Sequence, residues 1–373
     1  MQIEFLSLQN FRNLEPLDLR FSSKRVFIEG DNGQGKTNLL EAVFFCATGK
    51  SFRRATHQQI IQHQSESLQL SAHIERKTIH HKIDISVAPK KRSIQVDGRG
   101  VKKTSSLFEL LNVVAFFPDD LRIVKGSPEE RRRFLDRFVA NRTPAFVDAS
   151  SQYSKLLTSR NALLKSSTRI DPILLDTYDD GLIKHGIAMH RARLEALESL
   201  RPFASKHVDT ILGVGSDLRV NLDSGFGPLT AAEQYADAFK EALRHSLPKD
   251  RARGITSVGP HRADLDIYLG DLEARHYASQ GQQRAIILSM KLGEVELLKE
   301  HLSAAPILLL DDVSSELDSR RTEELFELIS LVGGQVFITT TGAANLPRTS
   351  NDQCLKVVDG RVLEATDLNY KVQ

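Results

Sequence analysis

Hydrophobic and polar residues alternate along several short segments of the first hundred residues, which is typical of strands with one buried face. The alternation predicts strands at residues 3–8, 17–21, 73–74, 83–87 and 93–96, with a hairpin turn at 89–92. A short apolar segment at 26–28 precedes a glycine-rich octapeptide, and apolar residues then recur with helical spacing over residues 39–47. The N-terminal part is therefore expected to be rich in sheet and to contain one strand–loop–helix unit.

The pattern changes after Pro128, where apolar residues recur with helical periodicity over long stretches. It predicts helices at 129–141, 145–165, 173–200 and 231–247, separated by prolines at 144, 172, 202 and 248. At 1.5 Å per residue, the stretch 173–200 gives a helix only about 40 Å long. This insertion is expected to form a short helical arm.

Strand patterns return in the last third of the chain. They predict strands at 265–269, 307–310 and 336–339, a helix at 282–301 and a final hairpin at 357–363 around the turn pair Asp359-Gly360. The expected fold class is α/β, with one sheet-containing head assembled from both ends of the chain and a mainly helical domain inserted between them. The expected parts are residues 1–126 and 249–373 for the head and 127–248 for the insertion.

The octapeptide at residues 30–37 reads Gly-Asp-Asn-Gly-Gln-Gly-Lys-Thr and matches a phosphate-binding loop. Glycines let backbone N–H groups approach phosphate oxygens closely, the following helix adds its positive dipole end, Lys36 adds a charge, and Thr37 adds a hydroxyl for Mg²⁺. A glycine-rich surface turn is the alternative, but the preceding strand and following helix favour the phosphate loop. The residues predicted to bind the nucleotide here are Gly30, Asn32, Gly33, Gln34, Gly35, Lys36, Thr37 and Asn38.

Two carboxylates follow the apolar strand at 307–310. Open α/β sheets bind ligands at the carboxyl ends of their strands, so this is where acidic residues can act on a nucleotide. Asp311 is predicted to hold Mg²⁺, and Asp312 to orient or deprotonate the attacking water, with Lys36 as the second catalytic residue. Two acids that simply end a buried strand are the alternative.

Composition describes an ordinary globular protein. The chain has 373 residues, of which 40% are hydrophobic and 26% are charged. It shows no apolar stretch of about eighteen residues and no basic leader followed by an apolar core, so we expect a cytoplasmic protein without a membrane segment. Cys46 and Cys354 are too few for a disulfide framework or a cysteine metal site and are expected to be buried small hydrophobic residues.

Net charge is only +2, but basic residues are locally concentrated. Residues 76–103 hold nine Lys or Arg against two Asp, and an arginine triplet lies at 131–133. Such stripes suit a polyanion such as nucleic acid. The alternative is a solvated surface, or pairing of the triplet with Glu129, Glu130 and Asp136. The candidate DNA contacts are Lys90, Lys91, Arg92, Lys102, Lys103, Arg131 and Arg132.

A polar segment at 279–284, Ser-Gln-Gly-Gln-Gln-Arg, opens the helix expected at 282–301. Alone it would be a turn that caps a helix. Together with Ser-Ser-Glu-Leu-Asp at 314–318, it resembles the signature and D-loop of ABC-type ATPases. In that family the signature of one subunit covers the γ-phosphate held by the other, so the resemblance implies an ATP-dependent homodimer in which Ser279, Gly281 and Gln282 contact nucleotide.

Further segments resemble one branch of that family, the bacterial recombination mediators related to SMC-type heads. They include Gln-Asn-Phe-Arg-Asn at 9–13, the loop Gly-Lys-Ser-Phe-Arg at 49–53, the stretch 117–136 and Gly-Pro-His-Arg at 259–262. The resemblance covers essentially the whole chain. It implies an ABC-type P-loop ATPase head with a short SMC-like arm, ATP and Mg²⁺ as cofactors, and Arg12 among the residues that bind ATP.

For function, the resemblance implies a weak DNA-stimulated ATPase that acts as a switch in recombinational gap repair and replication restart. The implied partners are double-stranded, single-stranded or gapped DNA and RecR- and RecO-like mediators, with roles in RecA loading and the SOS response. A transport ATPase subunit and a DNA-cleaving enzyme are the two rival classes. The former would copurify with membranes, and the latter would need a further acidic metal cluster.

Three departures from the ABC pattern stand out. The second acid is Asp312 where many ABC ATPases have Glu, which fits a slow hydrolase. The strand at 336–341 ends in threonines where transporters have a γ-phosphate-sensing histidine, so that role has no assigned residue. No clear glutamine precedes the insertion, which leaves residues 117–120 as a positional candidate for contact with the metal site.

Overall fold

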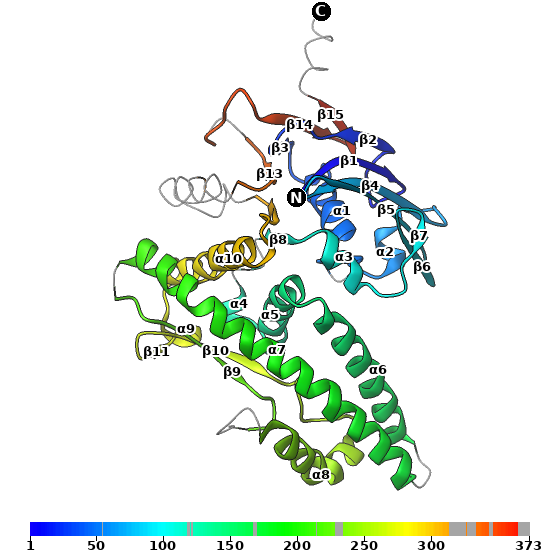
Figure 1. Cartoon of the computed structure of the whole chain (residues 1–373), viewed down its shortest axis with the longest axis vertical. Coiled ribbons are helices and arrows are strands. Elements are labelled where there is room, and N and C mark those ends of the chain that lie inside the picture. Colours follow the sequence, from blue (N-terminus) through cyan, green and yellow to red (C-terminus); the bar gives the residue numbers. More distant parts are fainter. Residues whose placement is uncertain are drawn as a thin grey trace, which may run out of the picture. The chain divides into compact units, whose positions relative to one another are not determined.

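The computed structural model describes residues 1–53, 55–117, 120, 122–166, 170–213, 215–227, 234–312, 326, 333–342 and 346–364. Two compact units make up the chain, one from residues 1–120 and 294–373 and the other from residues 121–293 (Figure 1). The first unit is thus assembled from both ends of the sequence, as the strand pattern predicts.

A mainly parallel sheet of six strands carries the phosphate loop. Its order is β15-β14-β3-β13-β12-β8, and only the pair β14 and β15 is antiparallel. The strands are β3 (Arg25–Glu29), β8 (Val113–Phe116), β12 (Ile307–Leu310), β13 (Val336–Thr340), β14 (Gln353–Val358) and β15 (Arg361–Glu364). Because β3 and β12 are both parallel to β13, which lies between them, the segments that follow them emerge at the same edge of the sheet.

The second sheet of this unit is antiparallel and has the order β2-β1-β4-β5-β6-β7. Its strands are β1 (Gln2–Gln9), β2 (Leu17–Arg20), β4 (Leu68–Arg76), β5 (Ile79–Ala88), β6 (Lys91–Val96) and β7 (Arg99–Gly100). The predicted strands in this region are confirmed, although the short one at 73–74 is part of the nine-residue β4. The hairpin predicted at 89–92 joins β5 to β6.

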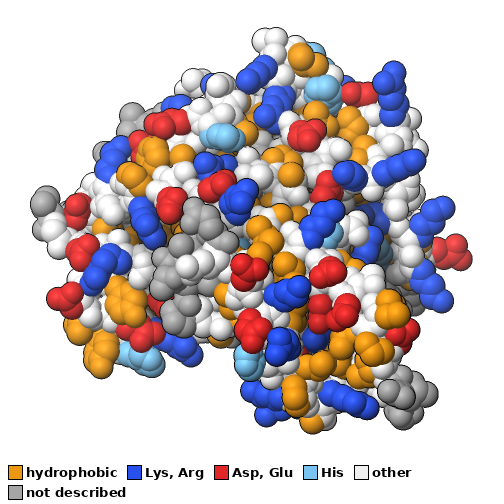
Figure 2. Space-filling model, turned by 60° about the horizontal axis from the view of Figure 1, so that its bottom comes forward, with side chains coloured by type: hydrophobic (Ala, Val, Ile, Leu, Met, Phe, Trp, Pro, Cys, Tyr) orange, Lys and Arg blue, Asp and Glu red, His pale blue; other side chains and the backbone are white. Residues whose placement is uncertain are grey.

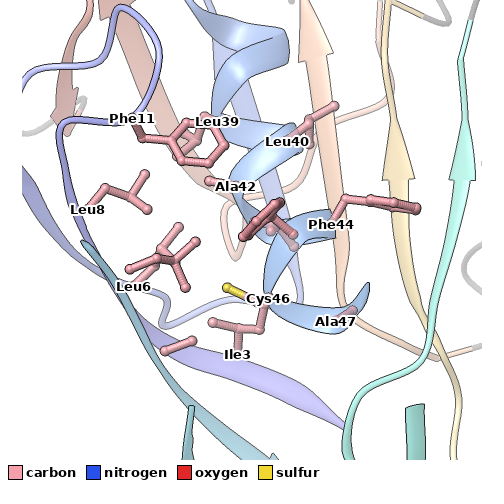
Figure 3. Close-up of a cluster of buried hydrophobic side chains, with 14 of the residues drawn as sticks. Ile3, Leu6, Leu8, Phe11, Leu39, Leu40, Ala42, Phe44, Cys46 and Ala47 are labelled. Carbon is pink, nitrogen blue, oxygen red and sulfur yellow. The ribbon is translucent and has the colours of Figure 1, made fainter. Parts of the chain in front are cut away.

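Helix α1 (Lys36–Thr48) forms the core of the unit, because all its residues except Thr37 and Asn38 are buried. It contacts β4 of the antiparallel sheet and both β8 and β13 of the parallel sheet. Figure 3 shows Ile3, Leu6 and Leu8 of β1 facing this helix. The short helices α2 (His57–Ile60) and α3 (Ser105–Leu110) complete the unit.

Helices dominate the second unit: α4 (Arg122–Lys125), α5 (Pro128–Arg142), α6 (Ala145–Lys165), α7 (Pro172–Leu212), α8 (Tyr235–Arg253) and α9 (Ala274–Tyr277). A small antiparallel sheet lies with them, in the order β11-β10-β9, with β9 (Leu218–Asp223), β10 (Asp264–Leu269) and β11 (Leu272–Glu273). The sequence pattern missed β9. Helix α10 (Gln280–Leu302) crosses the boundary between the units.

The prediction that Pro202 and Pro248 end helices was wrong, because both lie inside helices. Helix α7 has 41 residues, which corresponds to about 61 Å rather than about 40 Å. A proline removes one helical hydrogen bond, but tertiary packing can outweigh that cost. Around Pro202 the helix buries Leu200, Ala204 and Val208, so apolar burial continues through the proline.

The division of the chain differs from the expected one at its second boundary. Residues 249–293, expected in the head, lie in the second unit. There β10 pairs with β9 and contacts α5, which ties this segment to the helices.

In the part of the chain that the structure describes, no helix combines the length and apolarity needed to cross a membrane.

Candidate nucleotide-binding site

The loop between β3 and α1 depends on its glycines for shape. A Cβ atom on Gly30 would overlap the carbonyl oxygen of Val357 on the neighbouring strand β14. Gly33 and Gly35 have φ values of 82° and 117°, which side chains other than glycine rarely adopt. The loop therefore approaches β14 closely and turns into α1 with its backbone N–H groups available at the start of the helix.

Lys36 occupies the concave side of this loop. Its Nζ donates hydrogen bonds to the carbonyl oxygens of Gly30 and Asp31, at 2.6 and 2.9 Å. Burial lowers the pKa of Lys36, and the negative charges of Asp312 and Asp311 oppose that shift. The ammonium group is thus held by the carbonyls of the loop, where a phosphate would meet it.

The hydroxyl of Thr37 and the carboxylate of Asp311 are in direct contact. Thr37 Oγ1 donates to Asp311 Oδ1 at 2.9 Å, although the residues are 274 positions apart in the sequence. Burial raises the pKa of Asp311, and hydrogen bonds from Thr339 and Thr37 act in the opposite direction. A hydroxyl and a carboxylate are the hard oxygen donors that Mg²⁺ prefers, so this pair fits the metal.

Asp312 follows in a backbone conformation with φ of 49°. Its N–H donates to Thr339 Oγ1 at 2.9 Å. Asp312 follows β12 as Lys36 follows β3, and these two parallel strands end at the same edge of the sheet. The two predicted carboxylates and Lys36 therefore converge at one edge of the sheet.

Arg12 is fixed by a buried partner. Its Nε and Nη2 donate to the two carboxylate oxygens of Glu41 at 2.9 Å each, and its Nη1 donates to the Gln59 carbonyl at 2.8 Å. Glu41, on α1, is fully buried and also accepts a hydrogen bond from the Ser51 hydroxyl. The predicted role of Arg12 at ATP remains a prediction, and its observed contacts brace the segment before the phosphate loop against α1.

The polar residues of the loop are held from several directions. Gln34 accepts backbone N–H bonds from Asp359 and Gly360 of the C-terminal hairpin turn. Asn38 donates to Asn13 Oδ1 at 2.6 Å. Asn32 is exposed at the tip of the loop. These contacts connect both ends of the chain at the predicted nucleotide site.

Sequence reasoning assigned no role to Arg53, which the structure brings to the site. Its Nη1 donates to Asn38 Oδ1 at 2.7 Å, and its charge opposes the rise in the pKa of Asp311 that burial causes. The guanidinium lies 5.6 Å from the centre of the Phe52 ring, which stacks on Phe117 at 3.8 Å. The only available signal was its place at the end of the 49–53 segment.

The signature segment forms a helix cap. Ser279 Oγ accepts the Gln282 N–H at 3.2 Å, and Gln282 Oε1 accepts the Ser279 N–H at 2.9 Å. The buried Gln283 side chain donates to the Ala278 carbonyl at 2.5 Å. Ser279 is exposed and Gly281 is half-buried. A hydroxyl at an exposed helix N-terminus is chemically suited to an anion.

Two other sequence predictions fall partly or wholly outside the described residues. The D-loop candidate at 314–318 lies outside them. Of the positional candidates at 117–120, Phe117 and Asp120 are described, and Phe117 N–H donates to Asp120 Oδ2 at 3.0 Å. The proposed contact of this segment with the metal site stays a prediction.

Three predicted DNA contacts have structural partners instead. Arg131 is 2% exposed, and its Nε and Nη2 donate to the two carboxylate oxygens of Asp264 at 2.7 Å each, so its prediction as a surface contact was wrong. Arg132 donates to the Ala263 carbonyl at 2.6 Å. Burial lowers the pKa of both Arg132 and Arg92.

The guanidinium of Arg92 bonds to the Gly49 carbonyl and to Thr104 Oγ1. The other four candidates, Lys90, Lys91, Lys102 and Lys103, are exposed. On the face shown in Figure 2, basic and acidic side chains are interspersed. The basic hairpin turn at Lys90 and Lys91 is therefore the clearest remaining candidate for a polyanion.

Comparison with known proteins agrees with this geometry. Residues 2–361 match the family model described as RecF/RecN/SMC N terminal domain. The DNA replication and repair protein RecF of Lachnoclostridium phytofermentans is 38% identical over 368 residues, covering 97% of this chain and 99% of that protein. The protein of the same name from Myxococcus xanthus is 38% identical over 95% of this chain and 94% of its own length. The chain belongs to the RecF family.

Solved RecF structures share the fold. The recombination mediator protein RecF-ATPrS in the RecFOR pathway matches with a TM-score of 0.88 and 31% identity over 98% of both chains. RecF-ATP in the same pathway matches with a TM-score of 0.87 and 32% identity over 97% of both chains. An Smc head bound to the C-terminal winged-helix domain of ScpA, at 16% identity and a TM-score of 0.55, shares the fold alone. The predicted ABC-type ATPase head and its relation to SMC heads are confirmed.

Proposed function

We propose that this RecF family member is an ATP-dependent DNA-binding protein of recombinational gap repair and replication restart. In this proposal ATP joins two heads into a homodimer that retains double-stranded or gapped DNA, and slow hydrolysis releases it. The convergence of Lys36, Thr37 and Asp311 at one sheet edge carries the proposal. The names of the relatives, which describe DNA replication and repair and an ATP complex in the RecFOR pathway, support it.

Each residue of the site has a part in the proposed reaction. Backbone N–H groups of the loop and the start of α1 bind phosphate oxygens, and Lys36 turns from the loop carbonyls to the β- and γ-phosphates. Thr37 and Asp311 would hold Mg²⁺, which neutralises developing negative charge on the phosphates when bound. Asp312 orients the attacking water and accepts its proton. Its short side chain suits slow turnover.

The dimer supplies the missing cover for the γ-phosphate. Ser279, which caps α10 at an exposed position, would contact the ATP held by a second copy of the chain, with Gly281 and Gln282 beside it. The family resemblance adds two further parts to the proposal. The protein helps to load RecA together with RecR- and RecO-like partners, and it supports the SOS response. The cytoplasmic location expected from the sequence accords with them.

The amount of DNA that the protein retains with and without ATP tests the proposal directly. Binding to duplex, single-stranded and gapped DNA is compared with and without ATP at two salt concentrations, for wild type and Lys36→Met. ATP should increase retention by wild type alone, because the variant lacks the charge that binds the phosphates. Equal ATP stimulation in Lys36→Met would contradict the proposal.

Dimer formation is tested separately by fluorescence. Because the chain contains no tryptophan, a single introduced tryptophan gives a signal from one known position. Tyr277 lies two residues before Ser279 and is 67% exposed, so Tyr277→Trp places a single fluorophore beside the signature. ATP should shift its emission to shorter wavelength as the second copy covers it, and Ser279→Arg should prevent the shift while ATP still binds. Ile173→Trp, at a position 78% exposed on α7, is the control. An ATP-induced dimer of Ser279→Arg by light scattering would exclude the proposed role of the signature.

A further inference from the structure

Thr339, the fourth residue of β13, contacts the predicted metal ligand Asp311 and the predicted catalytic residue Asp312 through one hydroxyl. Its Oγ1 donates to Asp311 Oδ1 at 2.8 Å and accepts the Asp312 N–H at 2.9 Å. The residue is fully buried. Strand β13 lies between the strand that leads into the phosphate loop and the strand that ends in the two acids. The sequence placed threonines here but assigned them no role.

We infer that Thr339 is a positioning residue that holds the acidic end of β12 in the geometry required for metal-bound ATP. The inference deepens the proposed function and rests on it. Thr339 would not touch the nucleotide. It would act through Asp311, whose carboxylate it orients, and through Asp312, whose backbone it anchors.

The effect on Asp311 follows from a shared acceptor. Thr37 and Thr339 both donate to the same carboxylate oxygen, at 2.9 and 2.8 Å. Each hydroxyl has a single hydrogen. A metal held by the Thr37 oxygen would constrain how that hydroxyl points, whereas the Thr339 hydroxyl is positioned by β13 and would donate to Asp311 independently of the metal. Thr339 therefore fixes the orientation of the Asp311 carboxylate whether or not Thr37 binds the metal.

The effect on Asp312 concerns the backbone. Its φ of 49° lies in the left-handed region, which side-chain-bearing residues seldom adopt without support. The Thr339 hydroxyl accepts the N–H of this residue and so stabilises the turn directly after the strand. This turn fixes the backbone from which the Asp312 side chain leaves the sheet.

The neighbouring Thr340 provides a matched control. It is equally buried on the same strand, and its hydroxyl forms hydrogen bonds with the backbone of Gly342 at 3.1 Å. The same replacement at the two positions therefore removes the same group from the same strand. Thr339→Ser and Thr339→Ala form a second matched pair, because they differ only by the hydroxyl oxygen.

The test is calorimetric titration of the full-length variants with ATP, first in EDTA and then with Mg²⁺. Thr339→Val and Thr339→Ala should bind ATP in EDTA like wild type, but lose on the order of tenfold of the affinity gained with Mg²⁺, as expected for one lost hydrogen bond to a charged group. Thr339→Ser and Thr340→Val should show the same increase in ATP affinity with Mg²⁺ as wild type, which is called the Mg²⁺ gain below. Circular dichroism verifies folding, and the Ser/Ala pair decides the outcome if the valine variant does not fold.

The possible failures are distinguishable. Full retention of the Mg²⁺ gain in Thr339→Ala, or equal loss in Thr339→Ser, would overturn the positioning role while leaving the proposed function intact. Equal loss in Thr340→Val would assign the effect to strand packing and would also overturn it. If wild type itself gains no affinity with Mg²⁺, the proposed metal site fails and the role of Thr339 fails with it.

Discussion

Replacing Glu41 by Gln tests whether the buried ion pair beside the phosphate loop stabilises the head. Glu41 is fully buried on α1 and accepts two hydrogen bonds from Arg12 at 2.9 Å each, as well as one from the Ser51 hydroxyl. Glutamine has nearly the same shape but no charge. The variant leaves the Arg12 guanidinium facing a neutral amide whose NH₂ group cannot accept from it.

The expected cost can be worked from burial. Removing one partner of a buried ion pair costs about 3–5 kcal/mol. The Arg12 side chain is 18% exposed and can regain some hydration, so the lower end of the range applies. At 1.4 kcal/mol per factor of ten, a loss of about 3 kcal/mol makes opening of the helix roughly a hundredfold more frequent.

A thiol on the same helix reports this opening. Cys46 is fully buried and its pKa is raised by burial, so it reacts with a thiol reagent only when the core opens. Cys354 is partly exposed, and Cys354→Ser removes its background reaction. We expect Cys46 to be labelled roughly a hundredfold faster in Glu41→Gln under native conditions.

An exposed pair in the same unit supplies the control. Glu15 accepts from Arg361 Nε at 2.8 and 2.9 Å, but the two side chains are 46% and 68% exposed. Exposed ion pairs contribute little to stability, so Glu15→Gln should accelerate labelling less than about fivefold. Equal labelling rates in the two variants would refute the reasoning that burial makes Glu41 important.

Three further outcomes are expected. Lys90→Glu with Lys91→Glu should weaken DNA binding and reduce the slope of log affinity against log salt by about 2, whereas an unchanged slope would place the DNA surface elsewhere. Gly30→Ala should lower ATP affinity in titrations, because its Cβ would overlap the Val357 carbonyl oxygen, and wild-type affinity would contradict that geometry. Burial lowers the pKa of His190 to about 4, below its unfolded value near 6.5, so stability is full above pH 6.5 and falls by up to about 3 kcal/mol as pH drops toward 4. Denaturant melts of His190→Gln should show a flatter dependence over this window, and the wild-type slope in the variant would exclude His190 as its source.

The phosphate loop and the two acids could be predicted because their chemistry is local. Each is a run of a few residues whose types and order are set by backbone geometry or by strand ends. Their convergence was also predictable, since parallel strands deliver such segments to one edge. The contact between Thr37 and Asp311 spans 274 positions, yet it needed only this rule.

The basic stripes could not be interpreted in the same way. Arg131 looked like a surface cation, but its partner Asp264 is 133 positions away, at the start of strand β10. No local pattern identifies Asp264 as its partner. The sequence shows where charges are, whereas burial and pairing decide which of them a polyanion can reach.

Gln34 shows how the local motif depends on the completed fold. Its carbonyl accepts the N–H of Gly360 at 3.0 Å, and its side chain accepts the N–H of Asp359, from a hairpin that the chain adds more than 300 residues later. Gly360 also accepts the Glu15 N–H at 3.0 Å, so one turn joins the phosphate loop to the segment after β1. Closing so long a loop costs about 3 kcal/mol more than closing a ten-residue loop, because the entropic cost grows only with the logarithm of length. The phosphate loop can therefore be recognised from local sequence, but its shape is stabilised by hydrogen bonds to the C-terminal hairpin. ATP affinity should for that reason depend on correct packing of both ends of the chain.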